Sequence, residues 1–164
     1  MGNLLADRIE LAEQGNVRAQ FALGMMYHRG EDVSQDLKKA FHWYLKAAEQ
    51  DLAEALFKVG EMYYKGEGTP QIHQQAILWY GVAADKGIAD AMFSIGVMFH
   101  RGEGISKNYK KAIFWYEKAA ALGISEATYN LGCMYKQGEG VSKDFKKCLY
   151  YFTDSAEQRH VDAQ

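Results

Sequence analysis

The sequence predicts an all-α fold, built as an array of stacked helical hairpins, and three observations support this prediction. One pattern returns every 36 residues without an insertion, and its first glycine stands at Gly24, Gly60, Gly96 and Gly132. An internal period between 20 and 50 residues indicates a repeat array. Within each period apolar residues recur at spacings of three and four, as on one face of a helix. The chain also contains a single proline, Pro70, so few positions oppose helix formation.

We predict one domain, a repeat array over residues 1–164, and the 36-residue period divides it into repeats. A partial repeat over residues 3–18 comes first, with a predicted helix over 3–14. Four full repeats and the start of a truncated one follow: 19–54, 55–90, 91–126, 127–162 and 163–164. Because the chain starts and stops partway through a repeat, a fragment of a longer array is also compatible with it.

Composition and charge exclude several classes of partner. The net charge of −2 is the balance of 19 basic and 21 acidic side chains, so no basic field favours nucleic acid. No stretch approaches the ~18 apolar residues of a membrane span. The N-terminus has no secretory signal pattern, so we expect a cytoplasmic protein. The alternative is an exported protein whose signal peptide is absent from this chain.

The first helix of each hairpin, residues 19–29 in the first repeat, carries Leu23, Met26 and Tyr27 on its core face. A glycine in the middle of this helix costs about 1 kcal/mol of helix propensity, so its return in every repeat indicates close helix packing. The helix is predicted to end at a glycine with positive φ. These glycines are Gly30, Gly66, Gly102 and Gly138. The turn continues with a second glycine, Gly68, Gly104 or Gly140, or with Asp32 in the first repeat.

The second helix is predicted to begin after a short polar residue that caps its first turn, Asp36, Asn108 or Asp144. The second repeat has Ile72 there, so Thr69-Pro70 is expected to start that helix earlier. Large aromatic residues alternate with alanines along this helix, which lets neighbouring helices interlock. The first copy of this ladder is Ala40, Trp43, Tyr44, Ala47 and Ala48.

The pattern Leu23-Gly24, Tyr27 and Gly30, followed by Ala40, Trp43-Tyr44 and Ala47-Ala48, resembles a Sel1-like repeat, a relative of the tetratricopeptide repeat. The resemblance covers essentially the whole chain. It implies a right-handed α-solenoid whose concave side is lined by the first helix of each hairpin. It also implies a non-enzymatic adaptor that binds a protein or a peptide. Some cysteine-rich relatives carry a β-lactam-hydrolysing activity, so a hydrolase is the alternative function.

Helical phase predicts which residues line the concave side, because three positions of the first helix point away from its core face. Two interpretations of the aromatic residue at the first position stay open: packing on the next repeat, or a groove that anchors a partner. Cations at Arg29, Lys65, Arg101 and Lys136 could orient an acidic peptide or a C-terminal carboxylate. The predicted groove residues are Phe21, Met25, His28, Phe57, Glu61, Tyr64, Phe93, Val97, His100, Tyr129, Cys133 and Lys136.

No group of residues has the spacing that a known catalytic, cofactor-binding or metal-binding motif requires. Gly66-Glu67-Gly68 lacks the third glycine and the preceding strand of a dinucleotide loop. Ser34, like its copies, lies four residues before a lysine rather than three. The five histidines have no metal-ligand spacing. We therefore expect no catalytic residue, no cofactor and no metal site.

Two further expectations concern cysteines and chain ends. Cys133 and Cys148 are the only cysteines, both in the last repeat, and are expected to be reduced. Apolar residues near the ends could be uncovered and allow copies of the chain to pair end to end. These residues are Leu4, Leu5 and Ile9 at one end and Tyr150, Tyr151 and Phe152 at the other.

Overall fold

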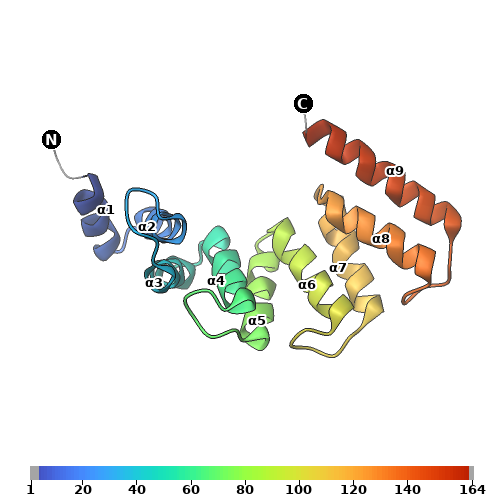
Figure 1. Ribbon diagram of the computed structural model, residues 1–164, viewed down its shortest axis with the longest axis horizontal. Coiled ribbons are helices and arrows are strands. Elements are labelled where there is room, and N and C mark those ends of the chain that lie inside the picture. Colours follow the sequence, from blue (N-terminus) through green and yellow to red (C-terminus); the bar gives the residue numbers. More distant parts are fainter. Residues whose placement is uncertain (1–3, 163–164) are drawn as a thin grey trace. The chain divides into compact units, whose positions relative to one another are not determined.

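The computed structural model describes the backbone of residues 4–162 and the side chains of residues 5–158. All regular structure in this part of the chain is α-helical, as predicted (Figure 1). The chain forms two compact units, Met1–Lys86 with α1 to α5 and Gly87–Gln164 with α6 to α9. The described helices are α1 (Leu4–Glu13), α2 (Val17–Arg29), α3 (Leu37–Glu49), α4 (Ala53–Lys65), α5 (His73–Asp85), α6 (Ala89–Arg101), α7 (Tyr109–Ala121), α8 (Ser125–Gln137) and α9 (Phe145–Asp162).

Each unit consists of helical hairpins that stack on one another. We call α2, α4, α6 and α8 the A helices and α3, α5, α7 and α9 the B helices, because each A helix packs against the B helix that follows it. The hairpins stack within a unit since α3 also packs on α4, and α7 on α8. The helix predicted over residues 3–14 is α1, which packs on α2. Residues 163–164, predicted to open a further repeat, lie outside the described residues.

Each A helix ends at a glycine in the left-handed region, as predicted. The N–H of Gly30 donates to the carbonyl oxygen of Met26 at 2.8 Å, which closes the last turn. Asp32 also has a positive φ of 60°, at the position where later repeats have glycine. The terminal glycines Gly30, Gly66, Gly102 and Gly138 have φ values of 73°, 74°, 78° and 78°.

Three of the four B helices begin at the predicted caps. A side-chain oxygen of Asp36 accepts from the backbone N–H of Lys39 at 3.0 Å, and Asn108 does the same for Lys111 at 3.0 Å. The bond from the Lys39 N–H holds the pKa of the Asp36 carboxyl below its usual value. Asp144 accepts from two N–H groups of the first turn of α9. The sequence therefore identified these helix starts correctly.

The predicted early start of α5 at Thr69-Pro70 is wrong. α5 begins at His73 and Ile72 stands at the cap, although its side chain makes no capping hydrogen bond. The reason lies in the backbone of the preceding turn, because the N–H of Ile72 donates to the Tyr63 carbonyl at 2.9 Å. Asp36 makes the equivalent backbone bond in the first repeat, also at 2.9 Å. The turn, rather than the capping side chain, sets where the B helix starts.

α2 begins two residues earlier than predicted, at Val17. Its cap is Asn16, whose side-chain oxygen accepts from the Ala19 N–H at 3.0 Å. The signal was present in the sequence, since asparagine is among the strongest capping residues.

The core of each hairpin is a contact between a glycine of the A helix and a buried ring of the B helix. A Cβ atom added at Gly60 would lie 2.6 Å from Cδ1 of Tyr80, and one at Gly96 would lie 2.6 Å from Cδ1 of Tyr116. These distances leave no room for a side chain, so the predicted close approach of the two helices is confirmed. The alanines of the B helices complete the core, as Ala40, Ala47, Ala76, Ala83, Ala112 and Ala119 are fully buried.

Candidate protein-interaction surface

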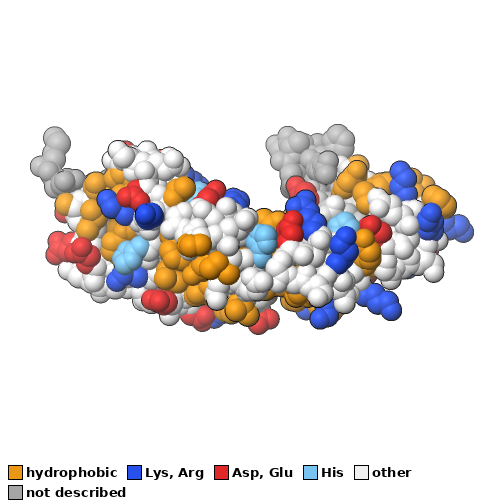
Figure 2. Space-filling model, turned by 60° about the horizontal axis from the view of Figure 1, so that its bottom comes forward, with side chains coloured by type: hydrophobic (Ala, Val, Ile, Leu, Met, Phe, Trp, Pro, Cys, Tyr) orange, Lys and Arg blue, Asp and Glu red, His pale blue; other side chains and the backbone are white. Residues whose placement is uncertain are grey.

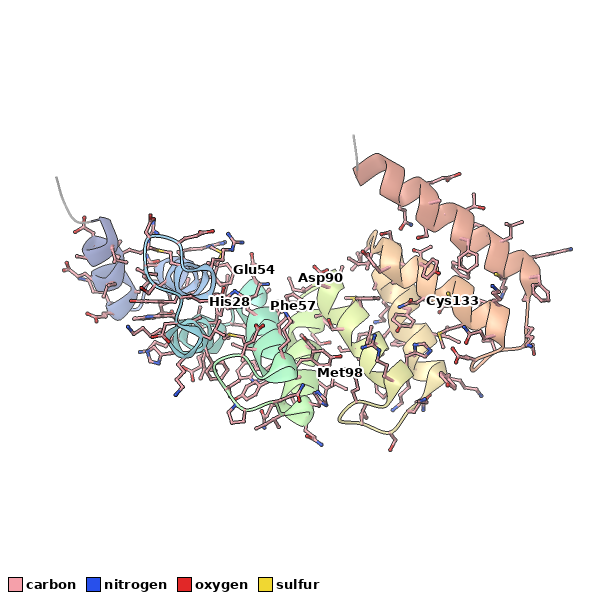
Figure 3. All side chains as sticks on the ribbon, in the orientation of Figure 1. His28, Glu54, Phe57, Asp90, Met98 and Cys133 are labelled. Carbon is pink, nitrogen blue, oxygen red and sulfur yellow. The ribbon has the colours of Figure 1, made fainter. Side chains whose placement is uncertain are left out.

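The twelve predicted groove residues all lie on the A helices. Ten of them are half-buried, while Tyr129 and Lys136 are exposed. His28, Phe57 and Cys133 show how single members project from α2, α4 and α8 (Figure 3). Acidic, basic and hydrophobic side chains lie side by side on the face shown in Figure 2. Side chains along the A helices thus remain partly accessible in both units.

The aromatic residue at the first groove position packs inside its own repeat. The ring centroid of Phe21 lies 5.5 Å from that of Tyr44, and Phe57 lies 5.6 Å from Tyr80. In the second unit the pairs are Phe93 with Tyr116 at 5.8 Å and Tyr129 with Phe152 at 5.2 Å. The ring on each A helix therefore packs against a ring on the B helix of the same repeat, and its other side stays accessible.

A histidine of the A helix reaches the turn of the following repeat. Nε2 of His28 lies 3.2 Å from a carboxylate oxygen of Glu67, and Nε2 of His100 lies 2.9 Å from Glu139. Sequence reasoning missed both glutamates. The signal available was their spacing, because each glutamate follows its histidine by one period and three residues. The two contacts join neighbouring hairpins within a unit.

Three of the four predicted cations on this surface are paired locally. Arg29 lies 3.4 Å from Glu31, and Arg101 lies 3.6 Å from Glu103. Lys65 lies 3.5 Å from Glu61. Such exposed pairs contribute little to stability, so these cations can still exchange their carboxylate for one on a partner.

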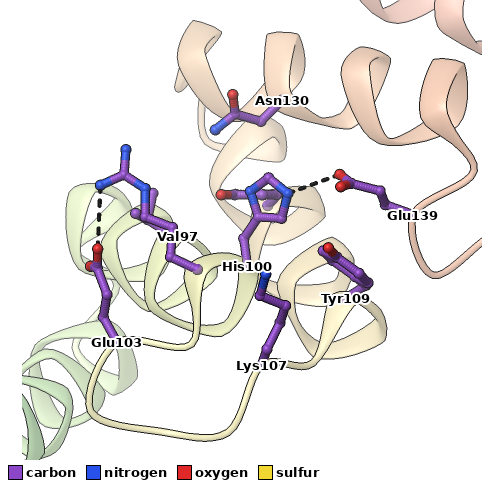
Figure 4. Close-up of a pocket in the computed structure, with 9 residues that line it drawn as sticks. Val97, His100, Glu103, Lys107, Tyr109, Asn130 and Glu139 are labelled. Atoms are coloured by element: carbon purple, nitrogen blue, oxygen red, sulfur yellow. Dashed lines mark hydrogen bonds and ion pairs between the residues drawn. The ribbon is translucent and has the colours of Figure 1, made fainter.

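The second unit contains a pocket of about 520 Å³ on this surface (Figure 4). Among its lining residues, Val97 and His100 were predicted groove residues and Arg101 a predicted rim cation. The others were missed because they come from the inter-helix turns, from the B helix α7 and from the neighbouring hairpin, and helical phase within one A helix does not relate these elements to it. They are Glu103, Lys107, Tyr109, Tyr116, Asn130 and Glu139.

Tyr116 is the most buried residue of this pocket. Its side chain is fully buried, and its hydroxyl has no hydrogen-bond partner among the described residues. Burial raises the pKa of Tyr116 to about 12, so the hydroxyl is protonated at neutral pH. The nearby side chain of Asn130 lowers the pKa of Tyr116 and so offsets part of this increase. It does not form a hydrogen bond of normal geometry with the hydroxyl.

A family model for the Sel1 repeat matches the chain four times, at residues 17–52, 53–88, 89–124 and 125–160. The chain belongs to the Sel1 repeat family. The Sel1 repeat fold is commonly a protein-interaction scaffold, and the family is generally non-catalytic. The comparison with curated proteins gave no match.

Several solved structures are similar to this chain. The protective antigen c5321 of uropathogenic Escherichia coli is 34% identical with a TM-score of 0.90, over 96% of this chain and 34% of the antigen. The chain thus spans about a third of that antigen's length. A Sel1 repeat protein from Oxalobacter formigenes is 32% identical with a TM-score of 0.83, over 94% of this chain and 69% of that one. Helicobacter pylori cysteine rich protein B is 25% identical with a TM-score of 0.58, over 77% and 96%.

Other chemical features of this Sel1 repeat protein are simple. Cys133 and Cys148 are free cysteines, the first half-buried and the second buried. No group of three His, Cys, Asp or Glu residues within the described chain could hold a metal ion. Among the helices described, none is both long and apolar enough to cross a membrane.

Proposed function

We propose that this Sel1 repeat protein is an adaptor that binds a peptide or protein partner along the A helices, the side expected to be concave. The observation that carries the proposal is the supported aromatic residue of each repeat, Phe21, Phe57, Phe93 or Tyr129. Aromatic residues supply much of the binding energy at protein interfaces. Because a B-helix ring already holds each of them in place, little side-chain entropy remains to be lost when a partner binds.

The first unit offers a direct test of these rings. Replacing Phe21 and Phe57 together by alanine should reduce capture of a partner in a quantitative pull-down at least tenfold, because two anchors are lost. The matched control replaces Leu78 and Val82 by alanine. These two side chains are exposed on the B helix of the same unit, at 63% and 43%.

Both double variants must retain their helical circular dichroism at the assay temperature. The proposal would be contradicted if the two variants captured the same amount of partner, whether that amount equalled the wild-type amount or was reduced. Should the variant at Phe21 and Phe57 not fold, leucine at both positions keeps apolar packing and replaces it in the comparison.

We infer a second candidate role, self-association through α9. Phe145 and Leu149 on this helix are 71% and 67% exposed. The residues that correspond to Leu149 in the first and third repeats, three periods and one period earlier, are not exposed in this way. Phe41 packs edge-on against Tyr63 at 5.2 Å, and Ile113 is only 8% exposed. A second copy that covers α9 would bury the same kind of surface.

Of the end residues expected to be uncovered, Tyr150 is 64% exposed, whereas others are packed. Leu5 and Ile9 pack on the core formed with Leu23 and Met26, and the side chain of Leu4 lies outside those described. Tyr151 stacks on Tyr135 with centroids 5.6 Å apart. We therefore place the proposed pairing on α9.

Light scattering at micromolar protein tests this role. The chain should form a dimer that Phe145→Lys together with Leu149→Lys reduces to a monomer, since two charges would enter an apolar contact. The control Leu78→Lys places a charge on an exposed position of α5 and should leave the dimer intact. A monomeric wild type would remove the idea.

A further inference from the structure

The hydroxyl of Tyr116 is the feature of the pocket that the fold itself does not explain. Burying a hydroxyl without a hydrogen bond destabilises a protein, so each such group in a native structure calls for a partner. Tyr116 borders a pocket large enough to admit one, since small-ligand sites typically measure about 300–1,000 Å³. A group supplied by a ligand would complete the missing bond.

The other polar groups of the pocket decide the chemistry of that ligand. Both lining carboxylates already have a basic side chain beside them, because Glu139 contacts His100 at 2.9 Å and Glu103 forms an ion pair with Arg101 at 3.6 Å. Lys107 has no carboxylate within ion-pair distance among the described residues, and its amine lies over the ring of Tyr109 at 5.6 Å.

The groups left over in the pocket offer more donors than acceptors. Lys107 and Asn130 reach the pocket from the turn before α7 and from α8 (Figure 4), and each offers N–H groups. With the hydroxyl of Tyr116 they make three donors that await an acceptor.

The first unit shows that the same positions can be satisfied internally. Gln35 stands two periods before Lys107, and its amide donates to the His28 carbonyl at 2.8 Å. Lys58 stands two periods before Asn130, and its amine contacts Glu61 at 2.6 Å. The surplus of donors around Tyr116 is therefore a property of the second unit and does not follow from the repeat pattern.

We propose that this pocket binds a carboxylate group of a partner peptide, which accepts hydrogen bonds from the Tyr116 hydroxyl, the Asn130 amide and the Lys107 ammonium. The inference rests on the proposed function as a peptide-binding adaptor, and it specifies one acidic residue or chain end as the part recognised here. Three donors from three elements give such a group a fixed position, and a charged acceptor strengthens each bond.

Three short peptides distinguish the sources of the carboxylate in an NMR titration of the full chain. Acetyl-Ala-Glu-Ala-amide carries it on a side chain, acetyl-Ala-Gln-Ala with a free end carries it at the C-terminus, and acetyl-Ala-Gln-Ala-amide has none. We expect one or both charged peptides to shift the side-chain amide signals of Asn130, and the neutral peptide to leave them unchanged. Equal shifts with the neutral peptide, or no shifts with any, would overturn the proposal.

Two substitutions test the donors. Lys107→Met and Tyr116→Phe should each weaken binding of the charged peptide about fivefold, the effect of one lost hydrogen bond. Among the described residues the Tyr116 hydroxyl makes no hydrogen bond of normal geometry, so the melting temperature of Tyr116→Phe should not fall. The matched control is Tyr44→Phe, the same change two periods earlier in the first unit, and it should bind like the wild type. Equal weakening by Tyr44→Phe and Tyr116→Phe would contradict the assignment.

The outcome is separable from that of the proposed function. Loss of partner capture on changing Phe21 and Phe57, combined with full binding by Lys107→Met and Tyr116→Phe, would leave the adaptor and reject the carboxylate site. Binding of charged peptides at Asn130 with unchanged capture by the Phe21 and Phe57 variant would do the reverse.

Discussion

Alanine at Gly68 is expected to destabilise the first unit by about 3 kcal/mol, the largest effect we predict for a single methyl group. Gly68 has a φ of 69°, a conformation that costs other residues roughly 1–2 kcal/mol. In addition, an added Cβ would overlap the backbone carbonyl of Leu37, at the start of the preceding B helix. A backbone atom cannot rotate away as a side chain can, so the two hairpins would have to separate.

Urea unfolding followed by circular dichroism measures this loss, and Gly15→Ala is its control. Gly15 also has a positive φ, 91°, but an added Cβ there would meet nothing within 4 Å. Gly15→Ala should therefore cost only the backbone strain, roughly 1–2 kcal/mol. If the two variants lost the same stability, contact between hairpins would play no part at Gly68.

Alanine at Gly60 is expected to cost about 2–3 kcal/mol, the upper part of the range for overpacked cores. The added Cβ would lie 2.6 Å from Cδ1 and 2.8 Å from Cε1 of Tyr80. The ring of Tyr80 is 2% exposed and is also held by Phe57 on the A helix, so it has no free space into which to turn. The A and B helices of this hairpin would be pushed apart.

The same substitution one helix away should have the opposite sign. Gly81 lies inside α5, and an added Cβ there would meet no atom within 4 Å. Gly81→Ala should raise stability by about 0.5–1 kcal/mol through helix propensity alone. A stability loss at Gly81 similar to that at Gly60 would show that the result reflects glycine removal in general and not the contact with Tyr80.

The hairpins could be predicted from the sequence because the signals that start and end their helices are local. Positive φ at Gly30 and a cap at Asp36 depend on a few neighbouring residues, and both were placed correctly. The start of α5 was misplaced because an i to i+9 backbone bond from Ile72 to Tyr63 overrode the cues at Thr69 and Pro70. Local propensity cannot report such a bond.

The candidate site was predictable only in part. Helical phase identified an aromatic position on each A helix, but it could not say that Phe93 would rest on Tyr116 of its own repeat. The pocket draws Asn130 and Glu139 from the next hairpin, and phase within a helix carries no distance between hairpins. The repeat pattern also could not predict that the Tyr116 hydroxyl has no hydrogen-bond partner among the described residues, because this depends on the packing of several elements.

Asp32 distinguishes the first hairpin of this chain from the later ones at the turn between the two helices. Asp32 adopts the left-handed turn with its side chain exposed, whereas a side chain at Gly140, three periods later, would lie 2.7 Å from Cβ of Tyr109. A hairpin bearing Asp32 could therefore not be transplanted behind another one without a collision at this turn. Any rearrangement or extension of these hairpins therefore has to keep the hairpin with Asp32 first.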